Sequence, residues 1–449
     1  MSLTRTLCSF LLLTTVFSFS QDDEATKNKG KLSGQWRTYY MNTFNNGGLK
    51  DFAALATGGK LKYQYSFGSR FKIGAALYNS TNLGIQDLTL PDATTNKLGR
   101  YEEGLFDRLD LENDAIFLLG ELYLNYKLSA HEITLGRMKL NTPLINPEDG
   151  RMIPTLVQGA WYAYTSKVSN VIKLGVFNRI APRSTSEFFR VGESIGTYPE
   201  GRNIDGKTHQ YYGNTNSDFL ALFNTDVKIS KKIQLNFWNF YVDNVTNSAY
   251  LKPKMQLNTK WALEAEWLHQ NRVGDGGNSL DSLRYFTSNT SDIVGVKLGY
   301  QHKRTKVSLA YDHILANGQF IFPREWGRED LFSFQKRERS EGSGDNHALV
   351  FYYDTQIELV PEQAKIQSIL SVGKHWKPTL TDAVLNKYAM PSYTQINLDL
   401  YFKFDNLKHL QPELLLVSKI GQGDIPHNPN FYLNKVDMFH VDLILNYNF

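Results

Sequence analysis

The sequence predicts an all-β protein, a transmembrane antiparallel β-barrel of about 18 strands with short turns at one end and long loops at the other. Three observations predict this fold. The 449-residue chain opens with a short apolar leader. Apolar and polar residues then alternate along most of the chain. The connections between these segments are alternately short and long. Large β-barrels are an exception to the expectation that a chain of this length forms two or three domains.

The first 20 residues, MSLTRTLCSFLLLTTVFSFS, have the layout of a secretory signal peptide. An apolar stretch follows Arg5, and the small residues Ser18 and Ser20 precede the expected cleavage site. The apolar stretch is too short to span a bilayer as a helix, and no later apolar run is long enough. We therefore expect a signal peptide at residues 1–20 and a membrane-spanning β-barrel domain at 21–449.

The composition excludes several classes of protein. Cys8, which lies in the leader, is the only cysteine, so the exported chain has no disulfide, no thiol nucleophile and no cysteine-ligated metal. The formal net charge is only +4 and is scattered along the chain, so no nucleic-acid partner is expected. We also expect no cofactor.

Sustained alternation is the evidence for strands. The segment QINLDLYFKF (395–404) places apolar residues on one face and mainly polar residues on the other, and the closing segment MFHVDLILNYNF (438–449) does the same, with Ile444 as an apolar residue on its polar face. A period of two predicts β-strands, because successive side chains of a strand point to opposite faces. The predicted strands begin near residues 31, 57, 70, 115, 131, 157, 170, 217, 232, 246, 260, 292, 305, 346, 366, 392, 413 and 438.

The connections alternate in length. FGSR, LSAH, SKKI and HKRT are short polar turns, whereas long loops are expected near 80–113, 181–215, 271–290, 315–345, 375–391 and 421–437. This alternation is typical of outer-membrane barrels, with short periplasmic turns and long external loops. A soluble β-sandwich or propeller would have to pack its apolar faces on one another, and no repeat of blade length appears. We therefore expect the apolar faces to meet lipid in a Gram-negative type of outer membrane.

The stretch GRMKLNTPLINPEDGRMIPTLVQGAW (136–161) differs from its surroundings. It contains three prolines, Pro143, Pro147 and Pro154. Proline cannot donate to a strand ladder, so this segment is expected to leave the sheet as a stiff loop. A stiff loop early in a barrel is suited to fold inward and narrow the lumen.

The same stretch resembles the corresponding segment of the OprD family of substrate-specific outer-membrane porins. In that family a proline-containing segment runs through an Asp-x-Arg turn and a proline into a Gln-Gly pair. Here Asp149, Gly150 and Arg151 form the turn, and a Gln-Gly pair follows at 158–159. The first strand, GQWRTYYMNTF, and the C-terminal phenylalanine are also similar to the family.

The resemblance implies a barrel of about eighteen strands with inward-folded loops and a line of basic side chains that guides carboxylate-bearing solutes. It also implies that Phe449 is recognised by the barrel-assembly machinery. The expected function is passive, substrate-selective diffusion of small polar solutes such as amino acids, peptides or organic acids. The expected partners are these solutes, outer-membrane lipid and the assembly machinery, and both a monomer and a homotrimer remain open.

Strand phase predicts which charges face the pore. In VIKLGVFNRI (171–180) the apolar residues in phase with Ile172 face lipid, so Lys173 and Arg179 are expected to face the pore. Arg137 has the lipid-facing phase by strict counting, and we expect a bulge to turn it inward. Charges on the expected constriction are candidates for selectivity, although any polar lumen needs hydrophilic residues without a specific role. The expected selectivity and pore-lining residues are Arg37, Arg137, Asp149, Arg151, Lys173 and Arg179.

The main alternative is an outer-membrane β-barrel enzyme, a phospholipase or protease; an adhesin or scaffold is a third hypothesis. HEITL (131–135) lacks the second histidine of a zinc-protease helix, and EGSG (341–344) is interpreted as a flexible loop tip rather than a nucleophile elbow. An acidic cluster at 107–114 could hold calcium, but it lacks EF-hand spacing and is interpreted as a solvated loop. We therefore expect no enzymatic activity and no metal site.

Overall fold

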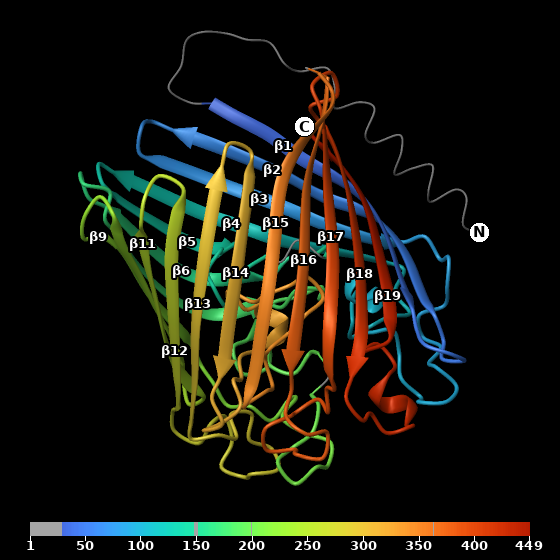
Figure 1. Ribbon diagram of the computed structural model, residues 1–449. Coiled ribbons are helices and arrows are strands. Elements are labelled where there is room, and N and C mark those ends of the chain that lie inside the picture. The colour runs from blue at the N-terminus through green and yellow to red at the C-terminus, as the bar shows by residue number, and fades with distance from the viewer. Residues whose placement is uncertain (1–28, 148–150, 199, 362) are drawn as a thin grey trace.

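The alternating segments form one continuous wall of antiparallel strands. The computed structural model describes residues 29–147, 151–198, 200–361 and 363–449. Within these residues, nineteen strands belong to a single sheet, which curls into a barrel (Figure 1). The signal peptide expected at residues 1–20 lies outside the described residues.

Most strands start within a few residues of their predicted positions. The strands are β1 (Lys29–Phe44), β2 (Phe52–Phe67), β3 (Phe71–Asn82), β4 (Ala115–Leu128), β5 (His131–Met138), β6 (Leu156–Thr165), β7 (Val171–Ala181), β8 (Phe189–Arg190), β9 (Leu220–Lys228), β10 (Ile233–Val242), β11 (Thr246–Gln256), β12 (Trp261–Arg272), β13 (Thr290–His302), β14 (Thr305–Ile314), β15 (Asn346–Val360), β16 (Ala364–Trp376), β17 (Ser392–Phe404), β18 (Leu410–Gln422) and β19 (Met438–Asn448). Three short 3-10 helices are η1 (Glu102–Leu105), η2 (Arg324–Trp326) and η3 (Pro429–Phe431). In the described part of the chain, no helix has the length and apolar character needed to cross a bilayer.

The barrel closes where the first strand meets the last. β1 pairs with β2 on one side and with β19 on the other. The C-terminal residue extends this seam, because the Phe449 amide donates to the Gly34 carbonyl (3.1 Å) and the Gly34 amide donates to the Phe449 carbonyl (2.8 Å). The two-residue strand β8 only extends the sheet beside the end of β7, so eighteen strands form the closed wall. Closure gives hydrogen-bond partners to the backbone N–H and C=O groups of the edge strands, which would find no water to bond in the interior of a membrane.

The two faces of the wall have opposite character, as β19 illustrates. Leu443, Leu445 and Tyr447 point outward and are 45%, 42% and 44% exposed, whereas Asp442 and Asn446 are 1% and 2% exposed. Ile444, on the inward face, packs with apolar residues of β1 and β2. The apolar face therefore points away from the lumen along this strand, as the sequence predicts.

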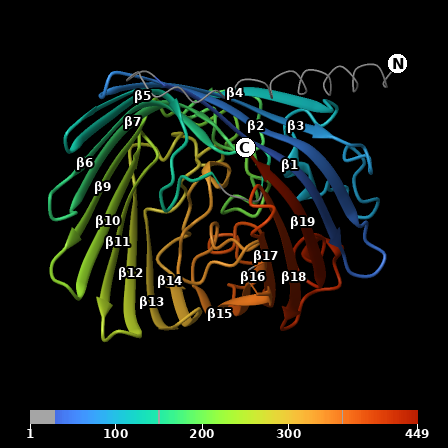
Figure 2. The ribbon, with the colours of Figure 1, turned by 90° about the horizontal axis from the view of Figure 1, so that it is seen from above.

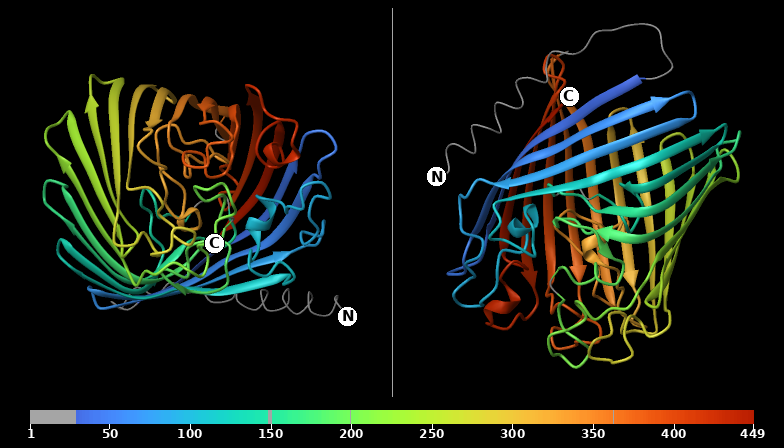
Figure 3. Two further views of the ribbon diagram at one scale, coloured as in Figure 1. Left: turned by 90° about the horizontal axis from the view of Figure 1, so that it is seen from below. Right: turned by 180° about the vertical axis from the view of Figure 1, so that it is seen from behind.

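Long loops gather at one end of the barrel, the lower end of Figure 1, and short turns at the other. Several of the long loops fold into the lumen, and their segments cross the interior when the barrel is seen along its axis (Figures 2 and 3). Leu144 and Ile145 of the loop 139–155 and Phe322 and Trp326 of the loop 315–345 share one core with inward residues of β10–β14. The constriction loop predicted at 136–161 thus folds inward, and the loop 315–345 folds inward beside it.

Candidate functional site

The loop 315–345 crosses the lumen and is anchored to the wall on both sides. Its polar contacts follow the order of the strands around the barrel. They are Asp330–Lys252 on β11 (3.2 Å), Ser333–Asp312 on β14 (2.6 Å), Gln335–Ser371 on β16 (2.9 Å), Lys336–Asp399 on β17 (2.7 Å), and Arg337 with Asp442 on β19 and with Tyr39 on β1 (2.8 Å). These contacts fix the path of the loop across the interior.

The sequence KRER at 336–339 makes this anchoring possible. These residues lie outside any strand ladder, so consecutive side chains leave in different directions. Arg337 has a φ of +68°, a conformation uncommon for residues other than glycine, and its guanidinium bonds to both sides of the closing seam. The run therefore anchors the loop to the wall through Lys336, Arg337 and Glu338 and is not a solvated charged patch.

Glu338 provides a buried ionic anchor of the loop. Its carboxylate lies 3.2 Å from the Lys377 ammonium and 3.6 Å from that of Lys419. Burial alone would raise the pKa of Glu338, but Lys377, His375 and Lys419 outweigh it and lower the pKa to about 2. The side chain is thus held ionised in the interior of the barrel.

Between these loops and the wall lies a cavity of about 830 Å³. Its lining comes from β1, β17, β18 and β19 and from the loops 83–114, 139–155, 182–219, 315–345, 377–391 and 423–437. The cavity therefore lies where the inward-folded loops meet the closing seam. It is large enough for a small organic solute.

The lining carries a marked excess of positive charge. Thirteen lysines and arginines face six aspartates and glutamates. Among the acids, Asp442 binds Arg337, Asp399 binds Lys336, and Glu103 binds Arg108. The cations are Lys97, Arg100, Arg108, Arg151, Arg183, Arg202, Arg324, Arg328, Lys336, Arg337, Arg339, Lys387 and Lys435.

The pKa of Tyr198 shows how strong this positive field is. Its ring lies between the guanidiniums of Arg108 and Arg183, 4.1 Å and 4.6 Å from the ring centre, and its hydroxyl accepts a hydrogen bond from Arg183 Nε (2.9 Å). Burial would raise the pKa of this phenol, but Arg183, Arg151 and Arg108 together lower it to about 6. An anionic group is therefore stabilised at this place in the cavity.

The fold and the cavity agree with a comparison of the sequence with known families. The chain matches the family "outer membrane porin, OprD family" over residues 29–341. The chain belongs to the OprD family. It is therefore an outer-membrane porin, with its long loops external and its short turns periplasmic. No curated protein sequence matches it.

Solved OprD-family structures have the same fold at low sequence identity. The chain is similar to Pseudomonas aeruginosa OpdK, solved with vanillate, with a TM-score of 0.68 and 15% identity over 94% of this chain and 98% of that one. Acinetobacter baumannii OccAB4 gives a TM-score of 0.68 and 15% identity over 96% and 100% of the two chains. Pseudomonas aeruginosa OccK9 (OpdG) gives 0.69 and 15% over 94% and 98%.

Two of the residues predicted for the pore of this OprD-family porin lie together. Arg151 is buried and lines the cavity. Arg37 faces inward from β1 and supports the constriction loop, because its guanidinium donates to the Arg151 carbonyl (2.8 Å) and to Asn446 Oδ1 (2.7 Å). The other predicted residue on this loop, Asp149, lies outside the described residues.

The other three predicted residues lie away from the cavity lining. Lys173 faces the lumen over the ring of Trp238 (5.6 Å). Arg137 lies opposite the exposed Leu122 and donates to the Leu119 carbonyl (3.2 Å). The β5 ladders run through Arg137 without a register shift, so the bulge expected to turn it inward is absent.

Arg179 departs from the expected phase for the opposite reason. Asn178 on β7 has no partner on β6, because the register shifts between Gln158 and Gly159. Phe177 and Ile180 are both fully buried in the lumen core, so Arg179 between them has moved to the other face. The prediction that Arg179 faces the pore by simple alternation is therefore wrong.

Most of the cavity cations come from loops that carry no periodic signal. The charged run at 336–339 was the available sequence signal, and it lies next to the segment 341–344, which we interpreted as a flexible loop tip. That interpretation is wrong, because Glu341 and Ser343 are buried. The acidic cluster at 107–114 is not drawn together as a metal-binding group among the residues that the structure describes.

Proposed function

We propose that the cavity is the selectivity region of a passive channel for small carboxylate-bearing solutes such as amino acids, peptides or organic acids. The observation that carries this proposal is the excess of thirteen cationic over six anionic side chains in its lining. Two opposite unit charges 4 Å apart attract by about 4 kcal/mol at an effective dielectric constant of 20 and by about 1 kcal/mol in bulk water. An attraction in this range favours entry of an anion and still allows its release.

Two further observations support this solute class. The pKa of Tyr198 is lowered to about 6, so the cavity already favours the anionic form of a group that belongs to the protein. The similar porin OpdK was solved with vanillate, which is an aromatic carboxylate. Both point to a carboxylate rather than to a neutral sugar.

Charge at Arg151 provides the test. We expect Arg151→Gln to slow liposome swelling by carboxylate-bearing solutes several-fold while swelling by neutral sugars of similar size changes little, and Arg151→Lys to retain most of the wild-type rate. Because the contact from Arg37 goes to the Arg151 carbonyl, the substitutions leave that support in place. Lys173→Gln, which removes a lumen charge away from the cavity lining, is the matched control.

Equal slowing of both solute classes by Arg151→Gln would show that Arg151 only shapes the loop. Unchanged flux of both classes would place selection elsewhere. The enzyme alternative has its own readout: hydrolysis of phospholipid or peptide by the purified protein, lost on substitution of an external-loop serine or histidine.

We also propose that residues 1–20 are removed as a signal peptide and that the barrel-assembly machinery recognises Phe449. The aromatic ring of Phe449 is on the exposed side of the seam, and its backbone pairs with Gly34. Cross-linking in detergent distinguishes the monomer from the homotrimer.

A further inference from the structure

The external neck of the loop 315–345 carries a cluster of histidines that the channel function does not use. β14 ends at Ile314 and β15 begins at Asn346, and these two residues are cross-strand partners. One step back along each strand, His313 pairs with His347. The inward-pointing neighbours Asp312 and Ile314 are buried, so His313 lies on the outward face.

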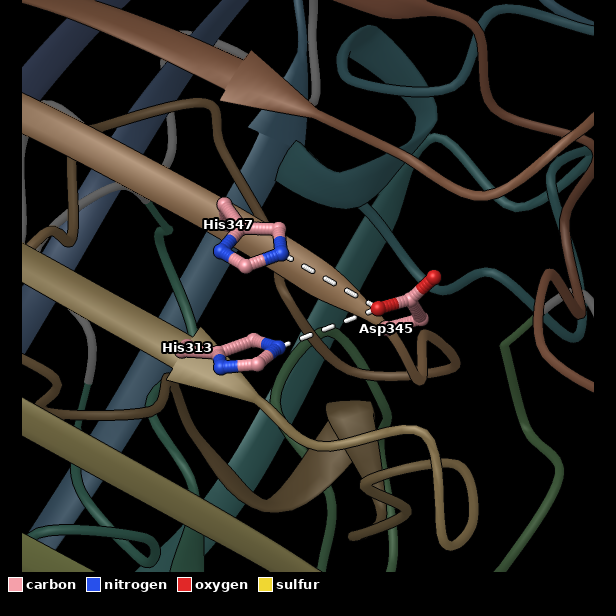
Figure 4. Close-up of side chains that lie close together, drawn as sticks. All are labelled: His313, Asp345 and His347. Atoms are coloured by element: carbon pink, nitrogen blue, oxygen red, sulfur yellow. Dashed lines mark ion pairs between the residues drawn. The ribbon is translucent and has the colours of Figure 1, made fainter.

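The two imidazoles and a carboxylate converge on one point. The rings of His313 and His347 are stacked, with centroids 3.8 Å apart and planes 15° from parallel. Asp345 Oδ1 lies 3.8 Å from His313 Nε2 and 3.9 Å from His347 Nε2 (Figure 4). The three ligand atoms lie within 4.8 Å of one another, and no other group of three metal-ligating residues forms among the residues that the structure describes.

These distances are too long for hydrogen bonds but are close to those that a shared ion imposes. Donor atoms at about 2.0–2.1 Å from a tetrahedral Zn²⁺ are roughly 3.4 Å apart. Binding requires Asp345, whose side chain is 52% exposed, to move inward and the two stacked imidazole rings to turn so that both Nε2 atoms point at one ion. A water molecule can reach the fourth position from the exposed side.

The surroundings prepare both histidines for a metal. His347 Nδ1 lies 2.6 Å from the Tyr311 hydroxyl, and a hydrogen bond on Nδ1 leaves Nε2 to bind the ion. His313 Nε2 is enclosed and has no hydrogen-bond partner among the described residues. A buried polar nitrogen without a partner costs free energy, and a bound cation would remove that cost.

We propose that His313, His347 and Asp345 bind a divalent transition-metal ion of the Zn²⁺ type, because imidazole and carboxylate together suit such ions. The ion joins β14, β15 and the last residue of the lumen-crossing loop. It therefore closes the neck of that loop, where the Asp345 amide also donates to the Leu315 carbonyl (3.2 Å). This site lies on the outer face and does not depend on which solute crosses the channel.

The test uses the full-length protein in detergent, purified without a histidine tag and stripped with a chelator. We expect one equivalent of Zn²⁺ to bind in calorimetry, and Co²⁺ to give visible absorption bands of a low-coordinate site. Tyr311→Phe should weaken Zn²⁺ binding by about tenfold or more, and His313→Ala and His347→Ala should weaken it further. His269→Ala is the matched control, because His269 also lies beside a carboxylate, Asp292 (2.8 Å), but is not part of the cluster.

Heat-modifiable gel mobility identifies variants that are still folded barrels, and only those are compared. Undetectable Zn²⁺ binding by the wild type would overturn the proposal. Equal affinity in wild type, His313→Ala and His347→Ala would also overturn it, as would a loss of binding in His269→Ala as large as in the cluster variants.

Discussion

Lys435 lies in the wall of the cavity, where its ammonium donates to the carbonyls of Tyr388 (2.8 Å) and Ala389 (3.2 Å). Among the described residues, no carboxylate raises the pKa of Lys435. Burial, followed by repulsion from Lys97, Arg100 and Arg202, lowers the pKa of Lys435 to about 7. One of the thirteen cavity cations therefore titrates near neutral pH.

We predict that anion preference depends on pH through Lys435. Below pH 7 the ammonium is charged and adds to the positive field, and as pH rises through 7 the charge is lost. Reversal potentials across planar bilayers in a salt gradient should therefore show a fall in anion preference between about pH 6 and 8. Lys435→Met should remove the part of this fall that is centred near pH 7 and leave only the step near pH 6, where Tyr198 loses its proton. A pH step of full size in the Lys435→Met channel would assign the titration to another group.

From the sequence, the face of a strand on which a residue lies can be predicted only where the alternation is unbroken. Alternation places Arg37 and Lys173 on the lumen side, as in the structure, because no register shift separates either residue from the neighbours that set its phase. One unpaired residue, Asn178, moves Arg179 to the other face, and an extra residue leaves no mark in a period-two pattern. Arg151 was found through its place in the proline-containing stretch instead.

The loop 315–345 is the element that most changes the interior. Its sequence has no period of two or of 3.6, so the sequence predicts only a long loop. Its path depends on wall residues distant in the chain, such as Lys252 and Asp442. Side-chain partners of this kind cannot be paired from one sequence, whereas proline, which excludes a strand locally, marked the loop 139–155.

We predict that Glu338→Gln releases this loop. The substitution removes the carboxylate that Lys377 and Lys419 share, and breaking a buried ion pair in this way costs about 3–5 kcal/mol. Single-channel recordings should show larger and noisier conductance, and external protease should cut within 315–345. Glu358→Gln, which breaks an exposed pair with Arg304, should change neither. Wild-type conductance and protease resistance in Glu338→Gln would show that the other anchors suffice.

At the scale of the whole molecule, the sequence predicts the wall far better than its contents. Eighteen of the strands start near their predicted positions, and only the two-residue β8 is missed. The wall is predictable because lipid outside and water inside impose one rule on every strand. The lumen follows no such rule, since residues of six different loops meet around its cavity.

At the seam where the wall closes, we also predict that adding a side chain at one glycine destabilises the barrel. A Cβ at Gly34 would lie 2.3 Å from the Phe449 ring and 2.9 Å from the Lys60 carbonyl oxygen. Gly34→Val should therefore open the seam and lower the temperature at which the barrel unfolds on semi-native gels. Gly48→Val, where a Cβ would meet nothing within 4 Å, should leave that temperature unchanged. Equal unfolding temperatures for both variants would mean that the seam tolerates displacement of Phe449.

The anchoring of Arg337 imposes an order in time on the maturation of the channel. Its guanidinium binds Tyr39, 298 positions earlier in the chain, and Asp442, 105 positions later. These two partners come side by side only when the last strand has paired with the first. The loop therefore lacks its full set of anchoring contacts during synthesis, export and early insertion. The Arg337 contacts that hold the loop at the seam therefore form only after the barrel has closed.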